Sequence, residues 1–363
     1  MQLPKLKIDD LEVDTPIIQG GMGIGISLSN LASAVANQGG IGVISSVGLG
    51  FKHEGSNVEN LLKEINKAKS NTNGILGVNI MAALTDYEKL VKASMNKVDI
   101  ILVGAGLPLS LPGLFSKKAW QEKNTKIAVI VSSARAAKII FMKWERKYGC
   151  VPDAVVIEGP KAGGHLGYKL DQIGKSANKL EKTLPKVEDT IDKYRESHNK
   201  NIPTIAAGGI YYGKDIKNFL DLGAAGVKMG TRFVGTKECD ADKNFKQQYI
   251  ESSQEDIKII ESPLGLPGRA INNNFLEQVS QGIKKPFQCP WKCMKSCKVQ
   301  EAPYCIAEAL LNAKKGILEE GFAFAGANGY LVDKIISVKK LFQNLKLEFE
   351  RATTEEKEFA FSN

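Results

Sequence analysis

The chain has 363 residues, of which 43% are hydrophobic and 25% charged, and its formal net charge is +9. This length and composition predict a folded protein with one large α/β domain and an added smaller domain, and they exclude a disordered chain. No apolar run is long enough to span a bilayer, and the first residues lack the apolar stretch of a secretion signal. We therefore expect a cytoplasmic protein with no membrane partner.

Much of the positive charge lies in amphipathic segments, such as Lys179 to Lys193 and Lys334 to Lys346. Segments of this kind are typical of helices with one solvated face. No zinc-finger, helix-turn-helix or aromatic-basic pattern accompanies the charge, so we expect no nucleic-acid partner. A basic surface favours anionic substrates, such as acyl-carrier conjugates, but charge alone does not identify one.

Short apolar runs alternate with helical patterns through the first two thirds of the chain. Most of these runs are apolar throughout, which indicates strands buried on both faces. Eight units in strict alternation predict a TIM (β/α)8 barrel rather than a doubly wound open sheet. The predicted strands are 16–19, 41–45, 75–81, 99–104, 126–132, 154–158, 202–207 and 226–233. The predicted helices between them are 28–37, 58–69, 86–96, 111–121, 134–148 and 214–222.

Two parts of the chain depart from this alternation. Residues 169–200, between the sixth and seventh strands, are highly charged and carry a helical pattern at 180–194. This insertion is either a lid over a pocket or a surface decoration. Residues 237–363, after a barrel formed by 1–236, contain helices, a Pro/Gly-rich turn region, a cysteine-rich segment and a final helix at 331–351. They predict a smaller, mostly helical second domain.

A glycine-rich loop, Gly20-Gly21-Met22-Gly23-Ile24-Gly25, follows the first predicted strand. It resembles a dinucleotide-binding fingerprint, but its glycine spacing differs from that fingerprint. The second strand also ends in Ile44-Ser45-Ser46, without the acidic residue that would hold a ribose. We therefore reject a Rossmann site. In a barrel, the same loop would pass close beneath a flat cofactor ring.

Further glycines end the seventh and eighth strands, as Gly208-Gly209 and Gly230-Thr231. Barrels commonly bind phosphate at these two strand ends through backbone N–H groups. A phosphate site beside glycine-lined strand ends suggests a mononucleotide cofactor, and flavin mononucleotide (FMN) fits best. Asn79 and Ser132 also end strands, and each either hydrogen-bonds the edge of the ring or caps the following helix.

One histidine lies in a glycine-rich run, Glu158 to Gly167, directly after the sixth strand. Gly163 and Gly164 carry no side chain, so a flat ligand can approach the backbone there. His165 follows them, and an imidazole can move a proton near neutral pH. A lone histidine is more often structural, but the glycines and the strand end favour a catalytic role for His165.

Together these motifs resemble the nitronate monooxygenase family, formerly called 2-nitropropane dioxygenase. That family is similar to the flavin-dependent enoyl-acyl-carrier-protein reductases of the FabK type. The resemblance implies a TIM barrel with non-covalent FMN, a small second domain over the site, and His165 as the catalytic histidine. It covers most of residues 10–240 and is carried by these motifs: Ile17-Ile18-Gln19-Gly20-Gly21-Met22, Ala162-Gly163-Gly164-His165, Ala206-Ala207-Gly208-Gly209-Ile210, Met229-Gly230-Thr231-Arg232-Phe233 and Pro267-Gly268-Arg269-Ala270.

The family resemblance implies two alternative reactions. In a nitronate monooxygenase, the substrate carbanion gives an electron to FMN and O2 completes the oxidation. In an enoyl reductase, NAD(P)H reduces FMN, which passes hydride to an enoyl thioester on acyl carrier protein. Both reactions need a histidine whose pKa lies near the working pH. The motifs and the resemblance together predict these FMN contacts: Gly20, Gly21, Met22, Asn79, Ser132, Glu158, Gly163, Gly164, Gly208, Gly209, Gly230 and Thr231.

Two positions resemble the reductases. The first loop contains Gly-Gly-Met where many monooxygenases have Ala-Pro-Met, and Leu166 follows His165 where many monooxygenases have arginine. The segment Met22 to Ser27 and the cysteine-rich tail instead resemble a bacterial branch described as nitronate monooxygenase-like. We predict a nitronate monooxygenase acting on nitroalkanes or alkyl nitronates, with the NAD(P)H-dependent enoyl reductase as the alternative. A homodimer is one candidate oligomeric state.

Two remoter functions also share these motifs. A flavin-binding electron carrier or sensor without its own chemistry is supported by the cysteine-rich segment alone, and the histidine counts against it. A purine-nucleotide barrel of the IMP dehydrogenase kind shares the phosphate loops. It would need a nucleophilic cysteine after the sixth strand, where this chain has Gly163-Gly164-His165.

Four of the six cysteines cluster, at Cys289, Cys293, Cys297 and Cys305. In a cytoplasmic chain such a cluster indicates metal binding rather than disulfides, although the spacing matches neither a zinc ribbon nor a common ferredoxin. On one straight helix, Cys289 and Cys297 would lie about 12 Å apart, so a shared metal site requires a bend, which Pro290 permits. Free thiols, an iron–sulfur cluster and a zinc site all remain open.

Overall fold

The computed structural model describes the chain apart from residues 1–2, 52–53, 290, 296 and 362–363, and apart from the side chains of 357–361. Pro290, on which the predicted bend depends, therefore lies outside the described residues. Among the described helices, none combines the length and the apolar character needed to cross a lipid bilayer.

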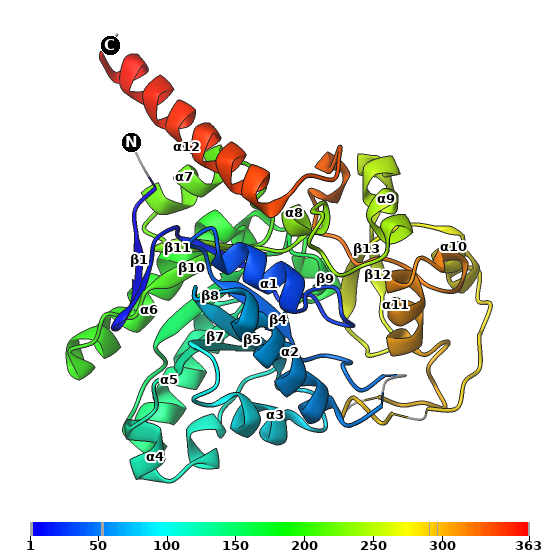
Figure 1. Ribbon diagram of the computed structural model, residues 1–363, viewed down its shortest axis with the longest axis horizontal. Coiled ribbons are helices and arrows are strands. Elements are labelled where there is room, and N and C mark those ends of the chain that lie inside the picture. Colours follow the sequence, from blue (N-terminus) through cyan, green and yellow to red (C-terminus); the bar gives the residue numbers. More distant parts are fainter. Residues whose placement is uncertain (1–2, 52–53, 290, 296, 362–363) are drawn as a thin grey trace.

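Eight parallel strands form the centre of the molecule (Figure 1). They are β3 (Ile17–Gln19), β4 (Gly42–Ser45), β5 (Leu76–Met81), β6 (Ile100–Gly104), β7 (Lys126–Val131), β8 (Ala154–Glu158), β10 (Thr204–Ala207) and β11 (Gly226–Met229). Neighbouring strands are hydrogen-bonded in the order β3-β11-β10-β8-β7-β6-β5-β4. Ile18 of β3 forms a parallel bridge to Ile41 beside β4, so the sheet is nearly closed. The predicted TIM barrel is confirmed, and all eight predicted strands are present.

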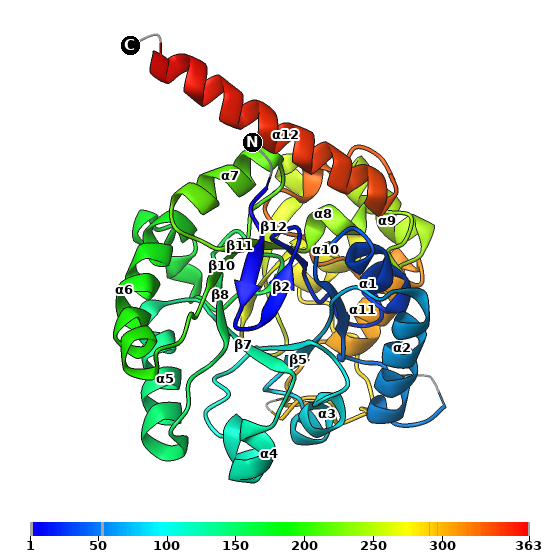
Figure 2. The ribbon, with the colours of Figure 1, turned by 60° about the vertical axis from the view of Figure 1, so that its left-hand side comes forward.

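Helices surround the barrel between consecutive strands (Figure 2). They are α1 (Ser29–Ala36), α2 (Asn57–Asn71), α3 (Tyr87–Ser94), η1 (Leu111–Leu114), α4 (Lys117–Gln121), α5 (Ala134–Tyr148), α6 (Leu180–His198) and α7 (Gly213–Asp221). Local chemistry sets the ends of α5. The Ser133 hydroxyl accepts the N–H of Ala136 at the start, and Gly149 adopts the left-handed conformation, with φ of 65°, at the end.

Three predicted boundaries are wrong. The eighth strand ends at Met229 instead of residue 233, because the chain turns after Gly230 into the short helix α8 (Thr231–Val234). The helix predicted at 111–121 is broken into η1 and α4, since Ser116 starts a new helix by accepting the N–H of Ala119. The last helix is α12 (Val338–Phe361), preceded by η6 (Gly329–Leu331), rather than a helix at 331–351.

The interior of the barrel and the layer between strands and helices form two separate cores. Successive residues of a strand point to opposite faces, so Ile18 and Ile100 belong to the interior while their neighbours Ile17 and Ile101 pack toward the helices. All four side chains are fully buried. Both faces of each strand are therefore covered, which explains the continuous apolar runs in the sequence.

A hairpin of β1 (Leu6–Ile8) and β2 (Leu11–Val13) crosses the N-terminal end of the barrel strands (Figure 2). Leu6 and Ile8 complete the interior core from below. Lys126, the first residue of β7, bonds Asp9 at 2.9 Å and also pairs with Asp10, and both aspartates lie in the hairpin turn. This end of the barrel is therefore closed by apolar packing and by ion pairs.

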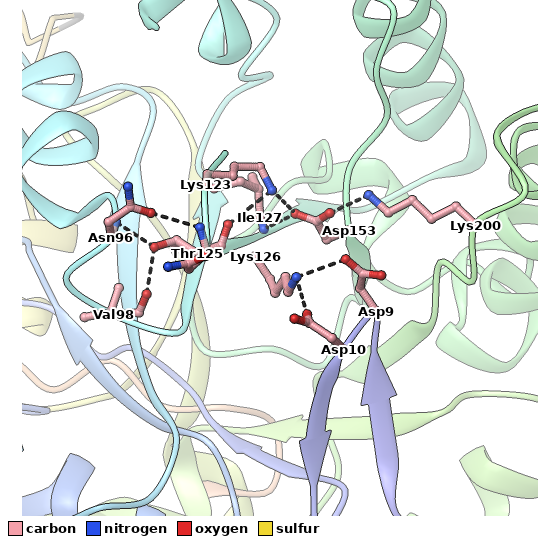
Figure 3. Close-up of polar contacts among 11 residues, drawn as sticks. Asp9, Asp10, Asn96, Val98, Lys123, Thr125, Lys126, Ile127, Asp153 and Lys200 are labelled. Carbon is pink, nitrogen blue, oxygen red and sulfur yellow. Dashed lines mark hydrogen bonds and ion pairs between the residues drawn. The ribbon is translucent and has the colours of Figure 1, made fainter. Parts of the chain in front are cut away.

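A second ion cluster lies beside the hairpin (Figure 3). The Asp153 carboxylate, buried just before β8, accepts hydrogen bonds from Lys123 Nζ at 2.8 Å, from the N–H of Ile127 at 2.6 Å, and from Lys200. Burial alone would raise the pKa of Asp153, but Lys123 and Lys200 outweigh it and hold the pKa below its usual value. The carboxylate therefore stays ionised between two lysines.

Residues 169–200 contain two short turns, η2 (Leu170–Gln172) and η3 (Ser176–Asn178), followed by α6. One face of α6, which includes Leu184, Val187 and Ile191, is fully buried, and this helix packs against α5, β8 and β10. It thus occupies the usual place of a barrel helix. A moving lid formed by the rest of this segment remains a prediction.

After residue 236 the chain forms a second, smaller group of elements. They are α9 (Lys243–Glu251), η4 (Gln254–Asp256), β12 (Ile257–Glu261), β13 (Pro267–Ile271), α10 (Asn274–Ser280), α11 (Ile306–Lys314) and η5 (Leu318–Glu320). The strands β12 and β13 were not predicted. They pair with each other, and β13 also pairs with β9 (Gly164–His165), which lies in the loop after β8. This sheet lies at the opposite end of the barrel from the β1–β2 hairpin (Figure 1). The last helix, α12, returns to pack against α7 and α1. A domain boundary at residue 236 remains a prediction.

Candidate active site

A cavity of about 650 Å³ lies at the C-terminal ends of the barrel strands. This volume falls within the range of small-molecule and cofactor sites. All thirteen residues predicted as catalytic or cofactor-binding line it: Gly20, Gly21, Met22, Asn79, Ser132, Glu158, Gly163, Gly164, His165, Gly208, Gly209, Gly230 and Thr231. The structure thus brings together residues that lie up to 211 positions apart in the chain. Their contact with a cofactor remains a prediction.

The first glycine loop lies directly against the mouth of the barrel. The N–H of Gly20 donates to the Met229 carbonyl at 2.8 Å, and the N–H of Met22 donates to the Ser27 hydroxyl at 2.8 Å. A Cβ atom on Gly21 would lie only 2.3 Å from Cβ of Asn79. The loop can approach β5 this closely only because Gly21 has no side chain.

The glycine–histidine loop is held in place by a buried arginine. Arg269 on β13 donates from Nη1 to the carbonyls of Pro160 and Ala162, at 2.7 Å and 2.5 Å. Burial lowers the pKa of Arg269 to about 10, which leaves the guanidinium charged at neutral pH. A Cβ on Gly163 would lie 2.6 Å from the backbone of Ala325, so a side chain is excluded there. This packing fixes the path of the loop up to the histidine.

His165 stands on β9, which pairs antiparallel with β13 opposite Gly268. Its Nε2 atom lies 2.7 Å from the hydroxyl oxygen of Ser262, and its ring meets the ring of Phe324 edge-on with centroids 5.1 Å apart. Ser262 is buried, and its hydroxyl also accepts the N–H of Leu264 at 3.2 Å. These contacts hold the imidazole in one orientation in the cavity wall.

Burial lowers the pKa of His165 to about 4. The sequence predicted a pKa near neutral, and the protein alone does not provide one, because desolvation disfavours the imidazolium. The ring is neutral at pH 7. Since Nε2 is bonded to Ser262, Nδ1 is the nitrogen left for a ligand. Nδ1 accepts a proton when Nε2 carries the hydrogen and donates it to the Ser262 oxygen.

Ser132 and Glu158 are linked by a tyrosine below the glycine–histidine loop. The Tyr168 hydroxyl lies 3.0 Å from the carbonyl oxygens of both residues, and the Ser132 hydroxyl donates to the Gly167 carbonyl at 2.8 Å. Ser132 is not a helix cap, because Ser133 caps α5. The Glu158 carboxylate instead approaches Lys228 Nζ at 3.6 Å, and both residues line the cavity. Ser132 retains its acceptor lone pairs for a ligand.

The ends of β10 and β11 are fixed by residues from the C-terminal region. Gly208 and Gly209 have positive φ angles of 96° and 84°, which favour glycine. The side-chain amide of Asn328 donates to the Gly209 carbonyl at 2.7 Å, and the N–H of Gly326 donates to the Thr231 hydroxyl at 2.9 Å. The Thr231 hydroxyl still has its own hydrogen to donate to a ligand.

The four clustered cysteines, unlike the predicted FMN contacts, do not all line the cavity. Of the four, Cys293 lines the cavity. In the part of the chain that the structure describes, no three His, Cys, Asp or Glu side chains form a group suited to a single metal ion. Metal binding at the cysteines remains a prediction.

Several residues of the site escaped the sequence analysis. Ser262 lies 97 positions from His165, and Phe324 lies still further along the chain. Lys228 was included in the eighth strand without a role. Ser262 and Phe324 belong to no glycine motif, and only the pairing of β9 with β13 brings their region to the histidine. An inward-facing lysine in an otherwise apolar strand was the one available signal, for Lys228.

Comparisons with known proteins agree with this geometry. The family model described as nitronate monooxygenase matches residues 5–348. A probable nitronate monooxygenase of Bacillus subtilis (strain 168) is 28% identical over 301 residues, covering 76% of this chain and 82% of that protein. The structure of FabK from Thermotoga maritima has 28% sequence identity and a TM-score of 0.74, and the match covers 96% of each chain.

A third relative carries a different activity in its name. It is the (3aS,4S,5R,7aS)-5-hydroxy-7a-methyl-1-oxo-octahydro-1H-indene-4-carboxyl-CoA dehydrogenase of Rhodococcus jostii (strain RHA1). The match is 29% identical over 271 residues and covers 74% of this chain. It covers 65% of that protein, so this chain spans slightly less than two thirds of its length.

Proposed function

Because the chain belongs to the nitronate monooxygenase family of oxidoreductases, we propose that it is an FMN-dependent enzyme that oxidises nitroalkanes or their nitronates with O2. The observation that carries this proposal is His165, a neutral, oriented imidazole in the wall of a glycine-lined cavity. A neutral imidazole can accept a proton, and the carbon beside a nitro group is acidic enough to give one.

The residues of the cavity fit FMN. A Cβ on Gly230 would meet only Met22, at 3.9 Å, and a Cβ on Gly164 would meet only Phe324, at 4.0 Å, so both glycines border free space. The backbone at Gly208, Gly209 and Gly230 suits a phosphate, since these residues stand at the strand ends where barrels commonly bind one. Met22, Asn79 and Ser132 would border the ring. When bound, FMN supplies the electron-accepting chemistry of the reaction.

His165 performs the proton transfer in this proposal. Its Nδ1 atom takes the proton from the substrate carbon while Nε2–H remains bonded to the Ser262 oxygen, and the carbon keeps the electron pair of the broken C–H bond. The resulting nitronate is an anion, and its negative charge beside Nδ1 stabilises the imidazolium and so opposes the desolvation that keeps the ring neutral before the transfer. Lys161, which also lines the cavity, adds a positive charge to its wall. A substrate supplied as the nitronate needs only this stabilisation.

The second candidate is an NAD(P)H-dependent enoyl-thioester reductase. The observation that favours it is Leu166, which is buried directly after His165 where a monooxygenase of the best-studied class has arginine. The similarity to FabK across almost the whole chain supports the same alternative. In that case His165 would polarise or protonate the thioester, and acyl carrier protein would be the partner.

One experiment separates the two functions. The purified protein is loaded with FMN, and its visible absorbance is followed without oxygen during addition of NADH, then NADPH, then the nitronate of 2-nitropropane. We expect the absorbance of the flavin band to stay unchanged when either nucleotide is added and to fall when the nitronate is added. O2 should be consumed when air is admitted. Bleaching by NADH or NADPH would favour the reductase. Failure to bind FMN would overturn both functions.

The cellular setting belongs to the same proposal. We expect a cytoplasmic enzyme that acts on a small molecule, and we retain the homodimer as a candidate oligomeric state. Light scattering after gel filtration measures the mass of the particle in solution, and a mass of one chain would exclude the dimer.

A further inference from the structure

One charged pair in the cavity is not used by the proton transfer proposed above. Among the described residues that line the cavity, the charged ones are Glu158, Lys161 and Lys228. Lys161 lies in an exposed loop, whereas Glu158 and Lys228 are residues of β8 and β11. Apolar side chains fill the barrel interior beside them. Burying an ion pair in such a place costs desolvation, so the pair calls for an explanation.

The register of the strands turns both side chains of this pair into the barrel. Ala207 of β10 is the register partner of Lys228 on one side and of Glu158 on the other, and it packs in the interior core. Residues in register on neighbouring strands point to the same face of a sheet. The small alanine lets the two longer side chains meet, with Lys228 Nζ 3.6 Å from Glu158 Oε2. The pair therefore forms part of the floor of the cavity.

The Lys228 ammonium has donors to spare. Its side chain is only 10% exposed, and its 3.6 Å separation from Glu158 is longer than a hydrogen bond of about 2.7–3.2 Å. Nζ also makes no hydrogen bond to any other residue that the structure describes. Lys126, at the opposite end of the barrel, is equally buried, but its Nζ bonds Asp9 at 2.9 Å and pairs with Asp10. The three N–H donors of Lys228 are therefore left for a ligand in the cavity.

These donors suit a ligand that presents oxygen or nitrogen acceptors and gains negative charge. Under the proposed function that ligand is FMN, and the inference rests on that function. The flavin ring carries carbonyl oxygens and acceptor nitrogens along one edge, and charge placed near it tunes its electronic properties. Asn79, a predicted neighbour of the ring, lines the same cavity from β5. In a site with little water, a fixed cation strongly stabilises negative charge that develops on its ligand.

We propose that Lys228 donates to the acceptor edge of the flavin ring and stabilises its reduced form. Reduction with two electrons and one proton adds one negative charge to the ring, and the ammonium offsets that charge. Glu158 limits the effect, because its carboxylate partly neutralises the ammonium. Lys228 thus sets how readily the bound cofactor accepts electrons, whereas His165 moves the proton.

The test is the reduction potential of FMN bound to the full-length protein. It is measured without oxygen against a dye of known potential, with dithionite as the electron donor and the buffer as the proton source. We expect Lys228→Met to weaken the binding of reduced FMN relative to oxidised FMN by about tenfold, which lowers the two-electron potential by about 30 mV. Lys228→Arg keeps the charge, so its potential should lie closer to that of the wild type.

A second variant should shift the potential in the opposite direction. Glu158→Gln removes the counter-charge and leaves the ammonium unopposed, so the bound FMN should be easier to reduce than in the wild type. A purely structural role of the pair would not give opposite shifts for its two members. If Lys228→Met does not fold, the direction of the shift in Glu158→Gln decides the question.

Lys126→Met is the matched control. Lys126 has the same exposure as Lys228 and also pairs with carboxylates, but it lies at the far end of the barrel. This variant should lose stability in thermal melting and keep the wild-type potential. An unchanged potential in folded Lys228→Met, or a potential that is not raised in Glu158→Gln, would overturn the inference alone. A wild-type protein that binds no FMN would overturn the proposed function, and this inference with it.

Discussion

The two ends of the barrel treat buried polar groups in opposite ways. At the N-terminal end, the buried Asp153 carboxylate is held between Lys123 and Lys200, and Lys126 is held by the aspartates of the hairpin turn (Figure 3). At the C-terminal end, His165 lies beside the neutral hydroxyl of Ser262, and burial lowers its pKa. The N-terminal end uses ion pairs to close the barrel, whereas the C-terminal end holds the His165 imidazole beside a cavity with a neutral hydrogen-bond partner.

This difference separates stability from chemistry. Barrel enzymes carry their catalytic groups at the C-terminal ends of the strands, and the opposite face contributes mainly to stability. Variants at the N-terminal end should therefore change mainly the free energy of unfolding, and variants at the C-terminal end mainly kcat/KM. The predictions below test that separation, from the largest expected effect to the smallest.

The largest effect is expected for His165→Ala. Loss of the imidazole should lower kcat/KM about 10²- to 10⁴-fold, because the proton acceptor is gone, while FMN remains bound. Steady-state kinetics and flavin absorbance measure both quantities. The control is His198→Ala, since His198 bonds Glu145 on α5 and lies outside the cavity lining. Equal activity in wild type and His165→Ala would remove His165 from the mechanism.

At the closed end, Asp153→Ala should destabilise the fold by about 3–5 kcal/mol, because it leaves two lysines without their buried partner. The folded fraction should keep its kcat/KM. Urea unfolding measures the free energy of unfolding. Asp171→Ala is the control, since Asp171 forms an exposed ion pair with Lys175 and its loss should leave the unfolding midpoint unchanged. A stable Asp153→Ala protein would show that apolar packing alone closes this end.

The variant Gly21→Ala tests the close approach at the mouth of the cavity. The added methyl would overlap Cβ of Asn79, so we expect a loss of about 1–3 kcal/mol of stability and weaker FMN binding. Flavin titration and urea unfolding measure the two effects. At Gly174 a Cβ would have no atom within 4 Å, so Gly174→Ala should change neither the stability nor the flavin affinity. Wild-type flavin affinity in Gly21→Ala would show that the loop is free to shift.

A smaller effect is expected for Ser262→Ala, because Ser262 acts only by positioning His165. Loss of one hydrogen bond is worth about 0.5–1.5 kcal/mol, so kcat should fall about 2- to 10-fold while KM stays unchanged. Ser262→Thr keeps the hydroxyl and should restore kcat. If threonine failed to rescue the rate, the hydroxyl contact to Nε2 would not be the cause of the loss.

The smallest effect concerns pH. The pKa of His165 is about 4, so its neutral form persists from pH 8 down to pH 6, and kcat/KM should stay nearly constant over that range. A histidine with an ordinary pKa of about 6.5 would lose most of its neutral form by pH 6. A profile of kcat/KM against pH distinguishes the two cases, and a decline centred near pH 6.5 would show that His165 in the substrate-free enzyme has an ordinary pKa.

Both ends of the barrel lose stability as the pH falls, but they lose it in different pH windows. Unfolded His165 binds a proton near pH 6.5 and folded His165 binds it only near pH 4, so this residue lowers stability as the pH falls through that window. The pKa of Asp153 is depressed, so its stabilising contribution is present above about pH 3.8 and is lost at lower pH, as the folded carboxylate becomes protonated. The Asp153→Ala variant should therefore lose its deficit relative to wild type only under strongly acidic conditions.

Much of this architecture could be predicted from local patterns. Eight buried apolar runs with helices between them were enough to give the barrel, since burial on both faces leaves a direct trace in the sequence. The glycine loops and His165 were found because they follow those runs, and the barrel topology places all C-terminal strand ends on one face. The strands β12 and β13 were missed, because Ile257–Glu261 and Pro267–Ile271 are only partly apolar and are separated by a Pro/Gly-rich turn.

The sequence by itself determined the barrel, the family resemblance and thirteen of the residues that line the cavity. Only the tertiary structure decided how His165 behaves. Its lowered pKa comes from burial, and its orientation comes from Ser262, which reaches it through the pairing of β9 with β13. Desolvation and long-range hydrogen bonds depend on which segments meet in space, and neither leaves a periodic or local signal in the chain.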